Sequence, residues 1–328
     1  MAKGINQKLK LLYIAQILEQ KTDEEHPIST QKLIEELAKH EISAERKSIY
    51  DDINQLIDFG YDIVVSKSRT NGGYYLASRH FELTELKLLV DTVQASRFIT
   101  LKKSRELIGK LNSMVSVNEE AQLKRDVFVQ NRIKTDNESI YYVVNDIYHA
   151  IQNNKMISFM YMEWNSKKEL APRHGGKRYE ISPFALTIKD ENYYLIAFDS
   201  DAGKIKHYRV DKIKEIRLEE KKREGIEMFE RFDVATYTNR SFGMFGGVDE
   251  TVTLRFPEKS IGIVIDRFGT DIDIRNGGDG MMLARVMVTV SNQFFGWITS
   301  LGGDVLIDAP TNVRQEYVDY LSKITNNY

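Results

Sequence analysis

The sequence predicts an α+β protein built from several domains, and three observations carry this prediction. At 328 residues the chain is longer than one ordinary domain, and 42% hydrophobic residues can form a core in each. Helical periodicity dominates the first 135 residues, whereas short alternating runs typical of strands fill residues 136–222. Strands and helices then alternate over residues 248–328.

The composition excludes several classes of protein. The 46 basic and 48 acidic side chains nearly balance, so any surface that binds an anion is a local patch and not a uniformly basic coat. The absence of cysteine excludes disulfides, thiolate metal sites and cysteine nucleophiles, and the six histidines lack a metal-ligand spacing. Without a signal peptide or a long apolar run, we expect a cytoplasmic protein with no membrane partner and no metal or other cofactor.

Residues 1–80 predict three helices followed by a hairpin. The first helix runs from about residue 6 to 20, the second follows Ser29, and the third is expected to begin after a cap at Ser43. Gly60 ends the third helix, and Asn71-Gly72 marks the turn of the hairpin. This arrangement describes a winged helix-turn-helix DNA-binding domain.

In that architecture the third helix enters the major groove and its first turns meet base edges. Arg46 is suited to a bidentate contact with guanine, Lys47 to guanine or phosphate, and Tyr50 to phosphate or a thymine methyl group. The predicted DNA-binding residues are Ser43, Arg46, Lys47, Ser48 and Tyr50 in the helix, with Lys67 and Arg69 in the hairpin. The alternative is a module for protein contacts, since Glu45 and Asp51 oppose a basic face.

Residues 81–135 predict a helical linker. Leu86, Val90 and Val93 recur at helical spacing, and a second helix is expected over about residues 104–114. These helices either carry a dimer contact or form a simple packed connection, and the sequence leaves both open.

Residues 136–222 predict one helix and about five short strands, as in a small Sm-like β-barrel. Tyr208 and Val210 share one face of a strand and belong to the core, which leaves His207 and Arg209 on the other face. Aromatic side chains among basic ones suit a nucleotide or single-stranded nucleic acid. The polar residues expected to gather there are Tyr161, Arg173, His174, Lys177, Arg178, Tyr194, Lys206, His207, Arg209 and Lys212. The alternative is a core of tyrosines whose basic neighbours pair with Glu163, Asp190 and Asp211.

The remaining chain predicts a linker over residues 223–247 and a domain over residues 248–328. The glycine cluster at 243–247 lacks the lysine and hydroxyl of a phosphate-binding loop, which favours a linker. The order of strands and helices after it, β-α-β-β-α-β, is ferredoxin-like. This acidic domain is expected to assemble a dimer or to close over the ligand. Asp271 and Asp273 alternate with isoleucines in a strand, so they predict an exposed face and not a metal site.

Three segments resemble one known family. Tyr193-Tyr194-Leu195 stands where that family has Trp-Tyr-Leu, residues 206–213 are similar to its basic segment, and residues 45–53 resemble its recognition helix. Residues 297–305 and the terminal helix resemble its C-terminal extension. The chain is thus similar, over nearly its whole length, to the WYL-domain transcriptional regulators, with a WCX-type extension.

The resemblance implies a sensor-regulator without catalytic residues. Its winged domain would bind double-stranded operator DNA as a homodimer, and such regulators are often linked to DNA damage or phage defence. The resemblance implies a nucleotide or single-stranded nucleic-acid ligand at the WYL domain, contacted by Tyr161, Arg178, Tyr194, His207 and Arg209. The runner-up is a protein-interaction adaptor whose winged domain binds no DNA.

Overall fold

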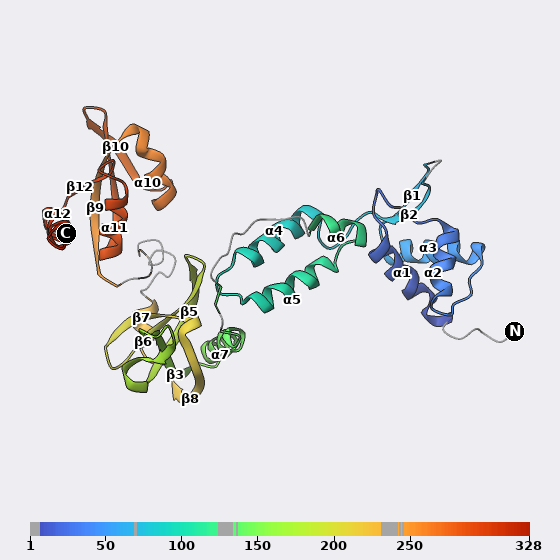
Figure 1. Cartoon of the computed structure of the whole chain (residues 1–328), viewed down its shortest axis with the longest axis horizontal. Helices are drawn as coiled ribbons and strands as arrows, with labels where there is room; N and C mark the ends of the chain where they lie inside the picture. Colours follow the sequence, from blue (N-terminus) through green and yellow to red (C-terminus); the bar gives the residue numbers. More distant parts are fainter. Residues whose placement is uncertain are drawn as a thin grey trace. The chain divides into compact units, whose positions relative to one another are not determined.

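The computed structural model has the α+β class predicted from the sequence, with several antiparallel sheets (Figure 1). It describes residues 7–68, 71–123, 134–135, 137–230, 242, 244 and 246–328. The chain divides into two compact units, Met1–Glu138 and Ser139–Tyr328. Among the described residues, no helix is long and apolar enough to cross a bilayer.

The first unit begins with three helices and a hairpin, in the predicted order. Its elements are η1 (Gln7–Leu9), α1 (Lys10–Lys21), α2 (Thr30–Ala38), α3 (Arg46–Phe59), β1 (Ile63–Ser66) and β2 (Gly73–Leu76). The helices bury one apolar stripe each, and Leu18, Leu33 and Ile49 from the three helices are fully buried in one core. The outward face of α3 therefore takes no part in this core.

The ends of α2 and α3 follow local capping rules, with one correction. The Ser29 side chain accepts a hydrogen bond from the Lys32 amide (3.3 Å), as predicted for the start of α2. The predicted cap at Ser43 is wrong: α3 starts at Arg46, and its N-cap is Glu45, whose side chain makes no capping bond. Gly60 closes α3 in the left-handed conformation (φ 116°), which glycine adopts without strain.

The hairpin is attached to the start of α2 by a close backbone approach. Ile28 and Tyr74 exchange two backbone hydrogen bonds of 2.8 Å, so residue 28 extends the two-stranded ladder of β1 and β2. A Cβ atom at Gly73 would collide with the carbonyl group of Ile28. Position 73 therefore needs glycine to keep the hairpin beside α2 and α3.

Three further helices complete the first unit. They are α4 (Leu83–Ala95), α5 (Leu101–Asn112) and α6 (Val117–Leu123). Leu86, Val115 and Leu123 form a small separate core, and a capping box between Glu82 and Glu85 begins α4.

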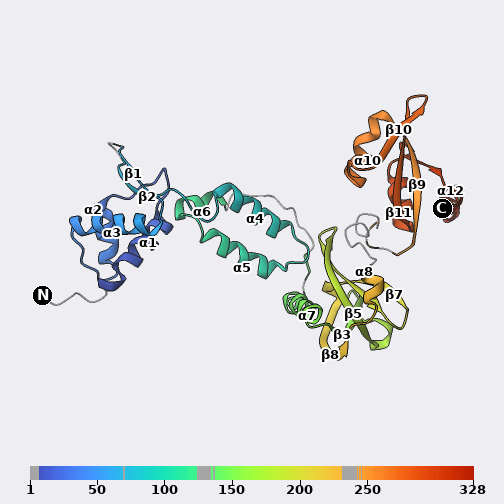
Figure 2. The same cartoon turned by 180° about the vertical axis from the view of Figure 1, so that it is seen from behind.

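The second unit opens with a helix and a six-stranded antiparallel sheet. The elements are α7 (Ile140–Gln152), β3 (Lys155–Trp164), β4 (Leu170–Pro172), η2 (Arg173–Gly176), β5 (Arg178–Lys189), β6 (Asn192–Asp199), β7 (Lys204–Arg209), η3 (Val210–Lys212), β8 (Ile213–Lys222) and α8 (Ile226–Glu230). The path β4-β3-β5-β6-β7 is completed by β8, which pairs with β3, so the sheet curls back on its first long strand. Figures 1 and 2 show α7 beside β3 and β8.

The C-terminal elements follow the predicted order β-α-β-β-α-β. They are β9 (Val248–Pro257), η4 (Glu258–Ser260), α10 (Ile261–Phe268), β10 (Asp273–Gly278), β11 (Met281–Val290), α11 (Asn292–Ser300), β12 (Leu306–Ala309) and α12 (Thr311–Thr325). The strands form one antiparallel sheet in the order β10-β11-β9-β12. Leu254, Phe256 and Val286 on one face of the sheet share a core with Phe294 and Ile298 of α11.

Candidate functional sites: the outward face of α3 and the pocket of the curled sheet

The first turn of α3 presents an arginine and a tyrosine that contact each other. Arg46 Nε donates a hydrogen bond of 2.7 Å to the Tyr50 hydroxyl, and both side chains are exposed. This bond from a guanidinium lowers the pKa of Tyr50. The terminal nitrogens of Arg46 have no hydrogen-bond partner among the described residues. The pair therefore holds the fork of Arg46 on the outer face of the helix with its outer donors available.

Lys47 and Ser48 follow Arg46 but serve different purposes. Lys47 is exposed, and within the described parts of the chain it makes no ion pair. The Ser48 hydroxyl donates to the Glu45 carbonyl (3.1 Å) and accepts from Lys10 Nζ (3.0 Å). Lys10 also pairs with Asp52 at 2.7 Å. Ser48 thus joins α3 to α1, whereas Lys47 is placed to reach an external partner.

The other predicted DNA-binding positions lie at the margins of this face. Ser43 is exposed ahead of α3, and Lys67 is exposed just after β1 in the hairpin. Arg69 lies outside the described residues. The structure therefore brings Arg46, Lys47 and Tyr50 together on α3.

The curled sheet carries a pocket whose floor is aromatic. Tyr161, Tyr179 and Tyr208 line it, and their rings pack on one another with centroids 5.6–5.9 Å apart. The buried ring of Phe159 lies beneath them, 5.7 Å from Tyr179. Burial raises the pKa of Tyr161 and of Tyr208, so both hydroxyls keep their protons at neutral pH. They are hydrogen-bond donors and acceptors at the base of the pocket.

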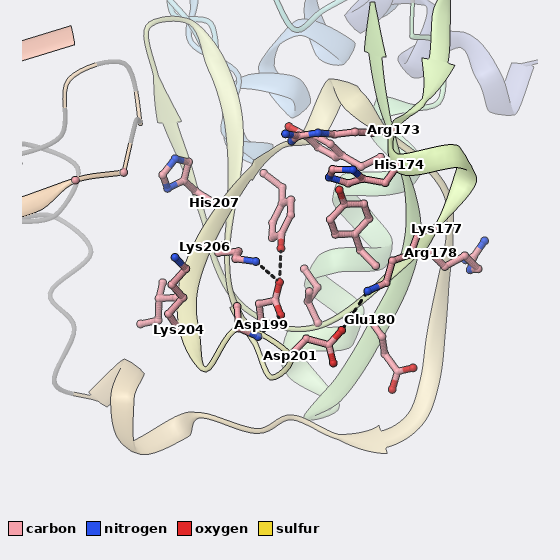
Figure 3. A pocket seen from close by; sticks show the side chains of 18 of the residues that line it. Arg173, His174, Lys177, Arg178, Glu180, Asp199, Asp201, Lys204, Lys206 and His207 are labelled. Atoms are coloured by element: carbon pink, nitrogen blue, oxygen red, sulfur yellow. Dashed lines mark hydrogen bonds and ion pairs between the residues drawn. The ribbon is translucent and has the colours of Figure 1, made fainter. Parts of the chain in front are cut away.

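An ion pair stands beside this floor. Lys206 Nζ lies 2.6 Å from Asp199 Oδ2, and the Tyr208 hydroxyl donates to the same oxygen at 3.2 Å (Figure 3). Burial alone would raise the pKa of Asp199, but the bonds from Lys206, the Ala202 amide and Tyr208 together hold it below its ordinary value. Asp199 is therefore ionised and keeps Lys206 partly neutralised.

Further basic side chains surround the opening from two sides. Figure 3 shows Lys204 and Lys206 on one side, facing Arg173 and Lys177 on the other. Arg173 pairs with Glu163 at 3.4 Å and Lys177 with Asp201 at 3.4 Å, both as exposed pairs. Exposed ion pairs contribute little and exchange readily with other anions. The rim can therefore offer positive charge to an incoming phosphate or carboxylate.

A left-handed turn shapes this rim. His174, Gly175 and Gly176 all have positive φ (51°, 65° and 87°), and they connect β4 to β5. The turn places Arg173 and His174 on the pocket side of the strands (Figure 3).

The structure divides the five predicted ligand-binding residues. Tyr161, Arg178 and His207 line the pocket, whereas Tyr194 and Arg209 do not. Arg178 is used structurally: its Nη2 donates to the carbonyls of Ser158 (3.2 Å) and Glu215 (2.7 Å) and so ties β5 to β3 and β8.

Arg209, one of the five predicted ligand contacts, is held by neighbouring side chains. Its guanidinium forms a bidentate pair with Asp211 (3.0 and 2.9 Å) and a further bond of 2.9 Å with Asn192. Burial is the largest single influence and lowers the pKa of Arg209. Asp211, Tyr194 and Tyr161 together outweigh burial, so the pKa is raised. This is the alternative in which a basic residue is satisfied by its acidic neighbour.

His207 and Tyr194 lie on the same side of the sheet as Arg209. The register pairs Tyr194 with Arg209, and Leu195 with Tyr208, so these two pairs point to opposite faces. Burial lowers the pKa of His207 to about 4, so its imidazole is neutral at pH 7 and offers no positive charge to an anion. Tyr194 is buried, with its ring 6.3 Å from that of His207.

The lining residues that the sequence analysis missed include Tyr179, Asp199, Lys204 and Tyr208. Tyr208 was expected in the core, and it is 5% exposed, yet its hydroxyl end reaches the pocket. A usable signal was the turn at residues 199–203, because a hairpin there pairs Asp199 with Lys204 and puts Lys206 and Tyr208 on the same face. Among the described residues, no group of three or more histidine or acidic side chains is placed to hold a metal ion.

Two domain families match the chain. The WYL domain matches residues 142–218 and the WCX domain matches residues 249–325. The chain is similar to the solved structure of proteasome accessory factor B/C (PafBC) of Arthrobacter aurescens, with 18% identity and a TM-score of 0.29. That similarity covers 97% of this chain and 48% of the PafBC chain. A CRISPR Cas-related protein is similar at 10% identity and a TM-score of 0.37, covering 100% of this chain and 87% of the other. No curated protein matches the chain significantly.

These matches define a protein in which a WYL domain is followed by a WCX domain, as the sequence resemblance implied. This order of domains is that of the WYL-domain regulators that the sequence resembles. The curled sheet is the WYL domain of this chain, and the sheet of β9–β12 is its WCX domain.

Proposed function

We propose that this protein is a DNA-binding transcriptional regulator whose WYL domain responds to an anionic ligand. The observation that carries the DNA-binding half is the outward face of α3. Arg46, Lys47 and Tyr50 are exposed there together, on a helix whose other face is buried against α1 and α2. A basic and aromatic helix end backed by two helices is the element that helix-turn-helix proteins insert into the major groove.

We assign different roles to the residues of this surface. Arg46 reads a base edge, because its fork is held outward by Tyr50 and matches the two acceptors of guanine. Lys47 contacts the phosphate backbone, as does Lys67 from the hairpin. Ser48 supports the helix through Lys10 and Glu45 and contacts no base.

The proposed ligand is a nucleotide or a short single-stranded nucleic acid that binds over the three tyrosines of the WYL pocket. Tyr161, Tyr179 and Tyr208 offer aromatic surface and protonated hydroxyls, while Lys206, Lys204 and the other rim residues pair with phosphate. Lys206 takes the role that the sequence analysis gave to Arg209. To bind, the phosphate displaces Asp199 from Lys206, so the ligand exchanges one ion pair for another.

We also propose that the regulator binds a palindromic operator as a homodimer, acts in the cytoplasm, uses no cofactor and catalyses no reaction. The signal passes along the chain through the helices of residues 81–135, which connect the two functions in sequence. A role in the response to DNA damage or phage remains part of the proposal.

A mobility-shift assay with the DNA upstream of the protein's own gene tests the first half. The proposal expects specific retention at physiological salt, and Lys206→Ala should leave this retention intact while it removes release or capture by nucleotides and short oligonucleotides. Binding that is blind to sequence and disappears at moderate salt would instead favour the protein-interaction adaptor.

A further inference from the structure

The outward face of the WCX sheet is a surface that the proposed function does not use. In the middle of β9 and β11 the side chains alternate: Leu254, Phe256 and Val286 are buried, whereas Arg255 and Arg285 are exposed. The same alternation exposes Arg275 on β10 and Leu306 on β12. One face of the sheet therefore packs on α11, and the opposite face meets solvent.

Three arginines converge on this face, which we call the arginine face (Arg255, Arg275, Arg285, Leu283 and Leu306). The register places Leu283 of β11 between Arg255 of β9 and Arg275 of β10. Strands lie about 4.8 Å apart, so these two arginines stand roughly 10 Å apart across Leu283. Arg285 is two residues along β11 and points to the same side.

The arginines outnumber the carboxylates on the arginine face. Arg255 has one distant, exposed carboxylate partner, Asp308 at 3.7 Å. Arg275 and Arg285 make no ion pair with any carboxylate in the described parts of the chain, although Asp273 stands directly opposite Arg285 in the register. A small cavity is lined by both arginines together with Thr253, Asp273 and Leu283. Three guanidinium groups stand against two carboxylates, Asp273 and Asp308, so the face keeps a net positive charge that attracts an anion.

The chemistry of this face fits a sugar-phosphate chain. Guanidinium groups pair with phosphate oxygens in a bidentate way and stack on bases, and apolar side chains between them can receive sugars and base faces. Leu283 and Leu306 alternate with the arginines across the strands, and Met287 extends the apolar surface along β11. An open antiparallel sheet with one uncovered face is also the surface on which single strands are bound in other nucleic-acid-binding modules.

We propose that the arginine face of the WCX domain binds single-stranded nucleic acid through consecutive phosphates. An acidic peptide would satisfy the guanidinium groups as well, but it would leave Leu283, Leu306 and Met287 without a partner. A strand on the arginine face requires neither Lys206 nor the three tyrosines of the WYL pocket.

The test measures the binding of a fluorescein-labelled single-stranded dT12 oligonucleotide to the full chain by anisotropy. The double variant Arg275→Glu, Arg285→Glu should bind about tenfold more weakly at low salt. The slope of log K against log salt should fall by about 1.4, because each phosphate contact on a single strand contributes about 0.7. The matched control is Arg314→Glu, Lys323→Glu, which makes the same charge change at exposed positions of α12 and should leave both values unchanged.

Two further arms separate this site from the WYL pocket and from a peptide site. Because the WYL pocket is itself proposed to bind short single strands through Lys206, the comparison is repeated in a Lys206→Ala background. There the arginine double variant should still weaken the remaining dT12 binding about tenfold, so the two proposals can fail independently. A poly-glutamate peptide of equal charge should compete weakly. Unchanged dT12 affinity when Arg275→Glu and Arg285→Glu are added to Lys206→Ala, or equal competition by poly-glutamate, would each overturn the proposal. The milder Arg285→Gln variant, with unchanged Trp297 fluorescence, guards against misfolding.

Discussion

The ammonium group of Lys206 lies 2.6 Å from the carboxylate of Asp199 at the mouth of the WYL pocket, and the Tyr208 hydroxyl bonds to the same oxygen. Asp199 and Lys206 come from adjacent strands joined by a short turn, so the pair forms locally and is held by the register of β6 and β7. An anion that enters the pocket meets a lysine already occupied by a carboxylate. The strength of this internal pair therefore sets how tightly the pocket can bind phosphate.

Replacing the carboxylate tests this competition. Asp199→Asn should bind ATP or a single-stranded pentanucleotide more tightly, because Lys206 loses its internal partner. The same change should lower the free energy of unfolding by about 1–3 kcal/mol, since a half-buried network loses its charged acceptor. Isothermal calorimetry and urea denaturation measure the two effects.

The neighbouring carboxylate Asp201 provides the control. It is exposed and pairs with Lys177 at 3.4 Å, so Asp201→Asn should change the unfolding free energy by less than about 0.5 kcal/mol. Equal affinity for the nucleotide in wild type, Asp199→Asn and Asp201→Asn would show that Lys206 is not where the phosphate binds.

His207 predicts a loss of stability in mild acid. Its folded pKa is lowered from 6.5 to about 4 by burial, so the folded protein resists protonation that the unfolded chain accepts. The contribution of neutral His207 to the free energy of unfolding is fully present above pH 6.5. It falls as the pH drops from 6.5 to about 4, by roughly 3 kcal/mol at most. Asp199, whose pKa lies below its ordinary value of 3.8, adds its own loss only at still lower pH.

The variant His207→Gln should lack the loss between pH 6.5 and 4.5, whereas His149→Gln on the exposed side of α7 should keep it. Urea denaturation followed by the fluorescence of Trp164, which lies in the same domain, gives the free energies. The same pH dependence in His207→Gln and wild type would mean that other groups cause it.

The sequence predicts which face of a strand each side chain occupies, but it does not predict what surrounds that face. Period-two alternation correctly separated Tyr208 and Val210 from His207 and Arg209. In a sheet that curls back on itself, however, the inner face both fills the core and lines the pocket, so Tyr208 is buried and still reaches the site. The environment of Arg209 is set by Asp211, two residues away, which accepts hydrogen bonds from Nε and Nη2 of the guanidinium group.

The helices of the first unit were predicted more closely because their signals are local. The stop at Gly60 and the cap at Ser29 need no knowledge of the rest of the chain. The start of α3 was misplaced by the assumption that Ser43 must cap it, whereas Ser48 bonds back to Glu45 from inside the helix. The arginine face was invisible in the sequence, since three arginines on three strands meet only through the register of the sheet.

Arg46 and Lys47 should respond differently to the operator sequence. Arg46→Ala should cost roughly 1–3 kcal/mol and relax specificity at one base position, because a base edge loses its bidentate partner. Lys47→Ala should weaken binding to all sequences alike and lower the salt slope by about 1. Competition mobility shifts with operator variants measure both, and Lys102→Ala on α5 serves as the control for charge. A uniform loss in Arg46→Ala would place that residue on the phosphate backbone.

Asp23 joins the three helices and hairpin of residues 7–76 to α6. It is buried between α1 and α2, and it accepts hydrogen bonds from the Ser116 hydroxyl (2.6 Å), His26 Nδ1 (2.7 Å) and the His26 amide (3.0 Å). Burial alone would raise its pKa, but these bonds and one from Asn118 together lower it. The carboxylate thus fixes the start of α6 to the turn before α2.

Removing the Ser116 hydroxyl should weaken the contact between Asp23 and the start of α6 without disturbing the second unit. Ser116→Ala should cost about 1–2 kcal/mol, since a buried carboxylate loses a short donor, and hydrogen exchange should speed up in α6 and in residues 22–28. Ser113→Ala, at an exposed hydroxyl that bonds only its own helix end, should change neither. Trp164 and Trp297 both lie in the second unit, so their fluorescence should stay the same in both variants. If Ser116→Ala exchanges no faster than Ser113→Ala, apolar contacts hold residues 7–76 to α6, and the hydrogen bond between Asp23 and Ser116 does not.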